Sequence, residues 1–188
     1  MRLPSPISPS YSEGVPLRMT TRTIATRSEA ATQSVGRALA PLSAPGDVVV
    51  LSGDLGAGKT QLTKGLAAGL GVAETVTSPT FNILLVHDGR IPLYHFDLYR
   101  LDDAKQLDDL DYWGTLEADG VSVVEWGDRF ERAMPDDGLV VRISITGDDE
   151  RTLEVTARGL RGQVLADAWC AACAELDDVS VDGVRDRS

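Results

Sequence analysis

The eight residues GDLGAGKT, from Gly53 to Thr60, constrain the fold of this 188-residue chain more than any other feature. They match the pattern GxxxxGK[ST] and follow the apolar run VVVL at positions 48–51. Glycines in such a loop let backbone N–H groups turn inward around phosphate oxygens, and the following helix adds the positive end of its dipole. A buried strand, a glycine loop and a helix in this order predict a phosphate-binding loop.

The residues around this loop suggest catalytic and metal-binding roles. Lys59 would supply positive charge to the β- and γ-phosphates, and the Thr60 hydroxyl is a candidate Mg²⁺ ligand. A carboxylate is needed opposite the loop, and two strands end in one: VSVV before Glu125 and YHF before Asp97. Glu125 and Asp97 are therefore candidates for holding the metal through its water or for positioning an attacking water. An ordinary acidic residue at a strand end is the alternative for either carboxylate.

Hydrophobic periodicity outlines the rest of the chain. Apolar residues recur at helical spacing after Ser28, a plausible N-cap residue, and again after Lys59. Helices are predicted at 28–42, 59–70, 102–112 (a helix or a pair of turns) and 164–176, and strands at 48–52, 83–86, 91–98, 121–126, 140–146 and 152–157. The order predicts an α/β fold of the P-loop NTPase type, a mostly parallel sheet flanked by helices with antiparallel edge strands.

Three segments are expected along the chain. Residues 1–20 are rich in Pro and Ser and read as a disordered N-terminal lead, with Met19 as a candidate start. Residues 21–160 would form the P-loop ATPase domain. Residues 161–188 would form a C-terminal helix and a loose acidic tail after Leu176.

Composition and charge limit the classes of function. There are 29 acidic against 18 basic residues, a net charge of −11, which suits a phosphate backbone poorly because such binding needs clustered Lys and Arg. A role in nucleic-acid biology would therefore depend on a partner. No apolar run approaches the roughly 20 residues of a membrane span, and prolines interrupt the N-terminus where a signal peptide needs an apolar core. The expected location is the cytoplasm, without membrane contact.

The cysteines, the SPTF segment and the histidines each allow a structural and a functional interpretation. Cys170 and Cys173 in WCAAC resemble a redox dithiol, but the Ala-rich surroundings favour two small residues on a helix. The SPTF segment ending at Phe81 could be a switch loop, although the segment alone favours a plain proline turn. His87 and His95 lack further ligands at zinc spacing, and His95 is expected to make a structural hydrogen bond rather than act as a general base.

Four segments in this order resemble the TsaE (YjeE) family: GDLGAGKTQL, TSPTF, YHFDLYRL and VVEWGDRF. The resemblance runs from about residue 26, where Thr32 matches a threonine of the family's N-terminal helix, to about residue 135. This family acts in making threonylcarbamoyl-adenosine (t6A) on tRNA. One segment departs from the family, because Lys105 and Gln106 stand where acidic residues are usual.

The resemblance implies an ATP and Mg²⁺ site in which Lys59, Asp97 and Glu125 are catalytic and Thr60 and Glu125 bind the metal, with Asp97 as a further candidate ligand. Thr80 matches the family's switch threonine, Asp97 its essential aspartate, and Glu125 and Trp126 its essential Glu-Trp pair. The implied nucleotide-binding residues are Gly53, Asp54, Leu55, Gly56, Ala57, Gly58, Lys59, Thr60, Gln61, Thr80 and Trp126.

The resemblance also implies a function: an ATPase, weak alone, that couples ATP binding and hydrolysis to the TsaB–TsaD pair and meets tRNA only through that complex. The main alternative is a small-molecule kinase, which generally needs a lid or acceptor-binding region with several arginines to close over the phosphates and exclude water. The sequence disfavours this alternative, because the only arginines between the loop helix and Glu125 are Arg90 and Arg100. No guanine-recognition motif of the NKxD type is present. A third hypothesis is that the chain is a nucleotide-dependent binding module without useful hydrolysis. Arg100 and Arg129 are candidates for stabilising transition-state charge.

Overall fold

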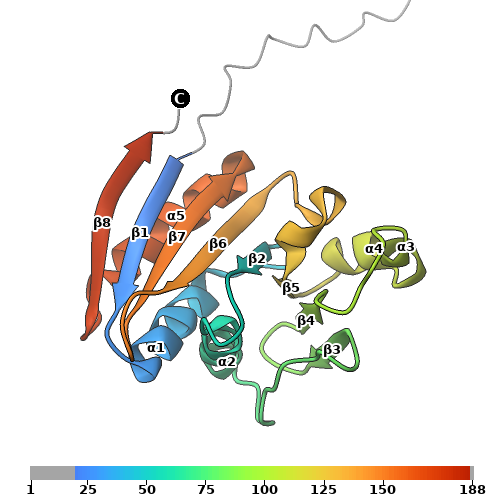
Figure 1. Ribbon diagram of the computed structural model, residues 1–188, viewed down its shortest axis with the longest axis horizontal. Helices are drawn as coiled ribbons and strands as arrows, with labels where there is room; N and C mark the ends of the chain where they lie inside the picture. Colours follow the sequence, from blue (N-terminus) through green and yellow to red (C-terminus); the bar gives the residue numbers. More distant parts are fainter. Residues whose placement is uncertain (1–19, 187–188) are drawn as a thin grey trace, which may run out of the picture.

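Strand β2 (Val48–Ser52) lies at the centre of the sheet, and all five of its residues are buried. Val49 and Leu51 belong to one hydrophobic core and Val48 and Val50 to another. Because successive side chains point to opposite faces, an apolar strand of this kind needs cover on both sides. The computed structural model, which describes residues 20–186, provides that cover with helices on both faces of the sheet (Figure 1).

In the described part of the chain, eight strands form one sheet in the order β3-β4-β5-β2-β6-β7-β1-β8, which Figure 1 shows from right to left. Within the described residues, the pairs β4–β5, β5–β2 and β2–β6 are parallel, and the pairs β3–β4, β6–β7, β7–β1 and β1–β8 are antiparallel. The expectation of a mostly parallel sheet is therefore wrong: the sheet is mixed, with a parallel centre. The other strands are β1 (Thr20–Thr26), β3 (Leu84–His87), β4 (Leu93–Asp97), β5 (Val121–Glu125), β6 (Gly138–Ile145), β7 (Arg151–Arg158) and β8 (Val179–Asp186).

The helices divide between the two faces. Helices α1 (Glu29–Leu39), α2 (Lys59–Leu70) and α5 (Gly159–Cys173) bury side chains in the larger core. The short helices α3 (Gln106–Asp109) and α4 (Tyr112–Leu116) cover the other face beside β2, β4 and β5. The part of the chain from residue 20 to residue 186 also contains three short 3-10 helices: η1 (Ala40–Leu42), η2 (Gly127–Arg129) and η3 (Glu131–Ala133). The predicted bounds of α2 and β2 are confirmed, and Ser28 caps α1 by accepting a hydrogen bond from the Ala31 N–H.

Helices α1 and α2 pack closely because glycine lies at their contact. A Cβ atom added to Gly65 of α2 would lie 1.9 Å from the Gln33 carbonyl oxygen of α1, far inside van der Waals distance. The contact therefore depends on the missing side chain, and it holds the start of α1 beside the start of α2.

The C-terminal segment differs from the sequence prediction. Helix α5 begins five residues before the expected start, and the expected loose tail instead pairs antiparallel with β1 as β8. A strand of this kind has little apolar pattern of its own and depends on its neighbour's hydrogen-bonding edge. The predicted lead, residues 1–20, lies outside the described residues except for Thr20. From residue 20 to residue 186, no helix is long and apolar enough to cross a membrane.

Cys170 and Cys173 lie on α5 as free, buried cysteines, which confirms the helical reading of WCAAC. Burial raises the pKa of both thiols, that of Cys173 to about 12. Trp169 is buried beside them and its Nε1–H donates to the Val35 carbonyl oxygen at 2.8 Å. A reactive dithiol needs a lowered pKa and access to solvent, so the cysteines are part of the core.

Candidate functional site

A glycine loop joins β2 to α2, and its backbone conformation requires glycine. Gly53 has φ of 135°, and a Cβ atom there would lie 2.2 Å from the Ile143 carbonyl oxygen of β6. Gly56 and Gly58 also have positive φ, a region that side-chain-bearing residues rarely adopt. The loop therefore lies against β6 and ends at the N-terminus of α2, where unpaired N–H groups and the helix dipole favour an anion.

Lys59, the first residue of α2, folds back over this loop. Its Nζ donates to the Gly53 carbonyl oxygen at 2.8 Å and to the Asp54 carbonyl oxygen at 3.0 Å. The ammonium group also lies 3.8 Å from the centre of the Trp126 ring. Only 5% of Lys59 is exposed, and its desolvation by burial lowers its pKa, while the charges of Glu125 and Asp97 oppose that shift. The site thus holds a poorly hydrated cation.

Thr60 and Glu125 meet across the site. The Thr60 hydroxyl donates to both carboxylate oxygens of Glu125, at 3.0 Å to Oε1 and 3.3 Å to Oε2. Glu125 ends β5, which lies next to β2 in the sheet, so its side chain reaches the start of α2. Trp126 follows with φ of 63°, and this left-handed residue turns the chain so that its ring covers Lys59. The ring of Tyr99 lies 5.1 Å from that of Trp126.

Asp97 is the second carboxylate and lies opposite Glu125 in the parallel pair β4–β5. Its Oδ2 accepts hydrogen bonds from the Ser78 hydroxyl at 2.7 Å and the Thr80 hydroxyl at 2.6 Å. Its Oδ1 accepts the backbone N–H of Tyr99 at 3.0 Å. The SPTF segment is therefore hydrogen-bonded to a carboxylate of the site.

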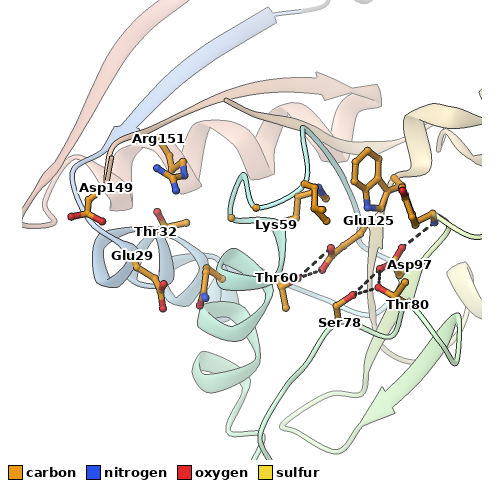
Figure 2. Close-up of a pocket in the computed structure, with 16 residues that line it drawn as sticks. Glu29, Thr32, Lys59, Thr60, Ser78, Thr80, Asp97, Glu125, Asp149 and Arg151 are labelled. Atoms are coloured by element: carbon orange, nitrogen blue, oxygen red, sulfur yellow. Dashed lines mark hydrogen bonds between the residues drawn. The ribbon is translucent and has the colours of Figure 1, made fainter. Parts of the chain in front are cut away.

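These groups line one cavity of about 420 Å³. Figure 2 shows Lys59 near its middle, with Thr60, Glu125 and Asp97 towards one end, and Glu29, Asp149 and Arg151 towards the other. The full lining is Glu29, Thr32, Leu55, Gly56, Gly58, Lys59, Thr60, Gln61, Ser78, Thr80, Asp97, Tyr99, Glu125, Trp126, Asp149 and Arg151.

The structure brings most of the expected site residues together. All three expected catalytic residues and both expected metal ligands line the cavity. Of the eleven residues expected to bind nucleotide, eight line it, and the remaining three, Gly53, Asp54 and Ala57, belong to the same loop but contribute no lining atoms.

The two arginines suggested for charge stabilisation lie elsewhere. The Arg100 guanidinium stacks over the Phe81 ring, 4.8 Å from its centre, and Arg129 donates to the backbone oxygens of Leu98 and Tyr99. Neither lines the cavity, whereas Arg151 at the start of β7 does.

Arg151 was missed by sequence reasoning. Its Nε donates to the Ala57 carbonyl oxygen at 3.0 Å, and its Nη1 binds carbonyl oxygens of the β6–β7 turn. It thereby joins the turn to the glycine loop. No local pattern marks a residue whose partner lies 94 positions away.

His95 makes a structural hydrogen bond, as expected, and its partner is Glu125. Its Nε2 lies 2.9 Å from Glu125 Oε1, and both side chains are buried. The alternation of β4 places His95 and Asp97 on the same face of the sheet, which is also the face of Glu125, the residue paired with Asp97.

Together, the fold and the cavity define a mixed α/β protein whose site lies at the carboxyl ends of parallel strands, between a glycine loop and two carboxylates. A family model described as "Threonylcarbamoyl adenosine biosynthesis protein TsaE" matches residues 26–153. The chain belongs to this TsaE family, which acts in t6A biosynthesis on tRNA, as the resemblance of its motifs indicated.

Individual proteins show the same relationship. The tRNA threonylcarbamoyladenosine biosynthesis protein TsaE of Bacillus subtilis is 41% identical over 150 residues, which cover 79% of this chain and 91% of that protein. The protein of the same name from Streptomyces coelicolor is 47% identical over 138 residues, covering 69% and 92%. The crystal structure of Bacillus subtilis YdiB superposes with a TM-score of 0.69 at 36% identity and covers 81% of this chain and 96% of that chain.

Proposed function

We propose that the chain is a P-loop ATPase that binds ATP with Mg²⁺ in the cavity and hydrolyses its terminal phosphoanhydride bond. Hydrolysis would be coupled to TsaB and TsaD homologues during t6A formation. The observation that carries the proposal is the contact between Thr60 and Glu125, which joins the first turn of α2 to the end of β5. A hydroxyl at that turn and a carboxylate at a neighbouring strand end form the arrangement that P-loop ATPases use for a metal-bound phosphate.

The glycine loop fits a phosphate chain. Its amides lie at the N-terminus of a twelve-residue helix, and Lys59 adds a buried charge whose hydrogen bonds to two carbonyl oxygens can be exchanged for phosphate oxygens. The cavity of about 420 Å³ lies within the usual size range of small-molecule sites. With the phosphates at Lys59 and Thr60, the nucleoside would lie towards the other end of the cavity, where Figure 2 shows Glu29, Asp149 and Arg151.

The donor set fits Mg²⁺. Thr60 supplies a hydroxyl oxygen and Glu125 a carboxylate, with Asp97 as a third donor, and Mg²⁺ prefers such hard oxygen ligands. Bound there, the ion would neutralise charge on the phosphates. Lys59 would stabilise the same charge as it moves towards the leaving group, and the carboxylates would orient the attacking water.

The loop carrying Ser78 and Thr80 would act as a switch. Both hydroxyls bind Asp97 in this structure, which occupies one carboxylate oxygen. A competing ligand at the cavity would replace these bonds and release the loop. The loop's position is thereby linked to the occupancy of the site, as a coupling subunit requires.

The charge of the chain supports contact with tRNA through partners. A net charge of −11 disfavours direct binding of a phosphate backbone. The chemistry on tRNA would then take place on the TsaD homologue, with this chain driving the cycle.

The test is phosphate release from ATP by the full chain, alone and with TsaB and TsaD, beside a Lys59→Ala control. Slow release alone, strong stimulation by the partners and loss of both in the control are expected. Phosphate transfer to an added small-molecule acceptor without the partners would instead indicate a kinase. ATP binding without release under any condition would indicate a nucleotide-dependent binding module.

A further inference from the structure

The Glu125 carboxylate has a second hydrogen-bond donor that the proposed reaction does not use directly. His95 Nε2 lies 2.9 Å from Oε1, and His95 is 0% exposed. Within the described residues, the hydrogen bonds to this carboxylate come from Thr60 and His95. Thr60 belongs to α2 and lines the cavity, whereas His95 belongs to strand β4 and is buried.

The hydrogen-bonding chemistry fixes the tautomer of His95. An ionised carboxylate only accepts hydrogen bonds, so Nε2 must carry the hydrogen, and a neutral ring then has a bare Nδ1. His95 Nδ1 is buried and has no partner among the described residues. An unpaired buried acceptor carries a free-energy cost that an apolar side chain would avoid. The hydrogen bond to Glu125 is therefore the interaction that an imidazole provides at this position and an apolar side chain would not.

We propose that His95 is a positioning residue that orients the Glu125 carboxylate. Its Nε2–H holds Oε1 from within the sheet, which fixes the rotation of the carboxylate towards the Thr60 hydroxyl and the cavity. The inference rests on the proposed function, in which Glu125 binds the metal and orients water. Partners that orient a ligating carboxylate commonly contribute 10- to 100-fold to metal affinity or rate, and we expect about that size of effect here.

His87 offers a matched control. It lies on the adjacent strand β3, is 3% exposed, and its ring centre is 6.1 Å from that of His95. Its Nδ1 pairs with Glu74 Oε1 at 2.5 Å, not with a carboxylate of the site. Replacing His87 therefore disturbs the same part of the sheet while the donor to Glu125 remains.

The kinetic test compares His95→Leu, His95→Gln and His87→Leu in the full chain with TsaB and TsaD. We expect His95→Leu to lower kcat by about 10- to 100-fold and to raise the Mg²⁺ concentration for half-maximal rate. Its affinity for ADP without Mg²⁺ and its melting temperature should stay near the wild-type values. His95→Gln places an amide N–H near the position of Nε2 and should recover most of the rate, and His87→Leu should keep the wild-type kcat.

Two further measurements make the result decisive. In a Glu125→Gln background, His95→Leu should cause no additional loss, because the two side chains act as a unit. Nitrogen NMR of the free wild-type chain should show the His95 hydrogen on Nε2.

The inference is overturned if His95→Leu keeps the wild-type kcat, if His95→Gln is as impaired as a folded His95→Leu, or if the hydrogen lies on Nδ1. If His95→Leu does not fold, the kcat of His95→Gln and the tautomer of His95 measured by NMR test the inference. A wild-type chain that releases no phosphate contradicts the proposed function instead, and the tautomer still tests the hydrogen bond.

Discussion

Glu125 lies 65 positions from Thr60 in the chain, yet its carboxylate accepts the threonine hydroxyl within hydrogen-bond distance. The parallel pairing of β5 with β2 and β4 brings it there, because strands that run in the same direction end at the same edge of the sheet. The two carboxylates therefore lie at strand ends beside the glycine loop and Lys59 but belong to other elements of the chain, so a substitution in a carboxylate leaves the phosphate-binding loop itself unchanged. Binding and hydrolysis should be separable by single substitutions.

Glu125→Gln is expected to reduce partner-stimulated phosphate release by about 100-fold or more, because the amide neither binds Mg²⁺ well nor orients water as a carboxylate does. Affinity for ADP should change little, since the glycine loop is intact. Phosphate release and ADP titration on the same preparation measure the two effects. Wild-type activity of the complex with this variant would favour the nucleotide-dependent binding module.

Cys170 and Cys173 should resist alkylation in the folded chain. A pKa raised to about 12 for Cys173 leaves only ~10⁻⁴ of that thiol ionised at pH 8, and both side chains are buried. Mass spectrometry after iodoacetamide treatment at pH 8 should find both unmodified, with the chain unfolded in guanidinium as the positive control. Rapid modification of the native chain would instead support the interpretation of WCAAC as a reactive redox dithiol.

The residues that were identified from sequence are those with a local signature. Lys59 and Thr60 stand at fixed positions of the glycine loop, Glu125 directly follows the mostly apolar run VSVV, and Asp97 stands in YHFDLYRL, a segment that resembles the TsaE family. Arg151 follows a polar turn, and its contact with the glycine loop depends on how β7 pairs with β6. Tertiary pairing of this kind leaves no trace in residue spacing.

At the scale of the elements, the α1–α2 contact determines how the glycine loop meets the start of α1. The Gln33 carbonyl oxygen of α1 occupies the place where a side chain of Gly65 would be. Gln33 also donates from its side chain to the Gln61 side chain at 2.9 Å, so the two helices are joined close to the cavity.

Gly65→Ala should destabilise the chain by about 2 kcal/mol, because the added methyl group forces the helices apart and outweighs the better helix propensity of alanine. Chemical denaturation would measure the loss. Gly183→Ala is the control, since an added Cβ there meets nothing within 4 Å. Equal stability of the two variants would show that the helices adjust without cost.

Elements with a strong pattern of their own were predictable, and those that depend on a neighbour were not. Strand β2 is apolar throughout, and α2 begins at the glycine loop and ends before Gly71, so both had local signals. Strand β1, with the sequence TTRTIAT, and strand β8 have no comparable apolar run. Their places follow from the open edge of β7, to which β1 pairs, and from the edge of β1 itself.

At the scale of the whole molecule, the net charge of −11 should keep the chain from binding tRNA by itself. A gel-shift assay at about 0.15 M salt should show no complex with the chain alone, and TsaB and TsaD should bring it into a tRNA complex. The partners without this chain are the control. Salt-sensitive binding of tRNA by the isolated chain would contradict this prediction.

The most direct test of the central claim is repeated t6A formation by TsaB and TsaD supplied with tRNA, ATP and threonylcarbamoyl-adenylate. The number of modified tRNA molecules per complex would be counted with the wild-type chain and with Glu125→Gln, which should still bind ATP. We expect many rounds with the wild-type chain, and with the variant no more modified tRNA than complex present. Many rounds with Glu125→Gln would show that ATP hydrolysis at this site does not drive the cycle.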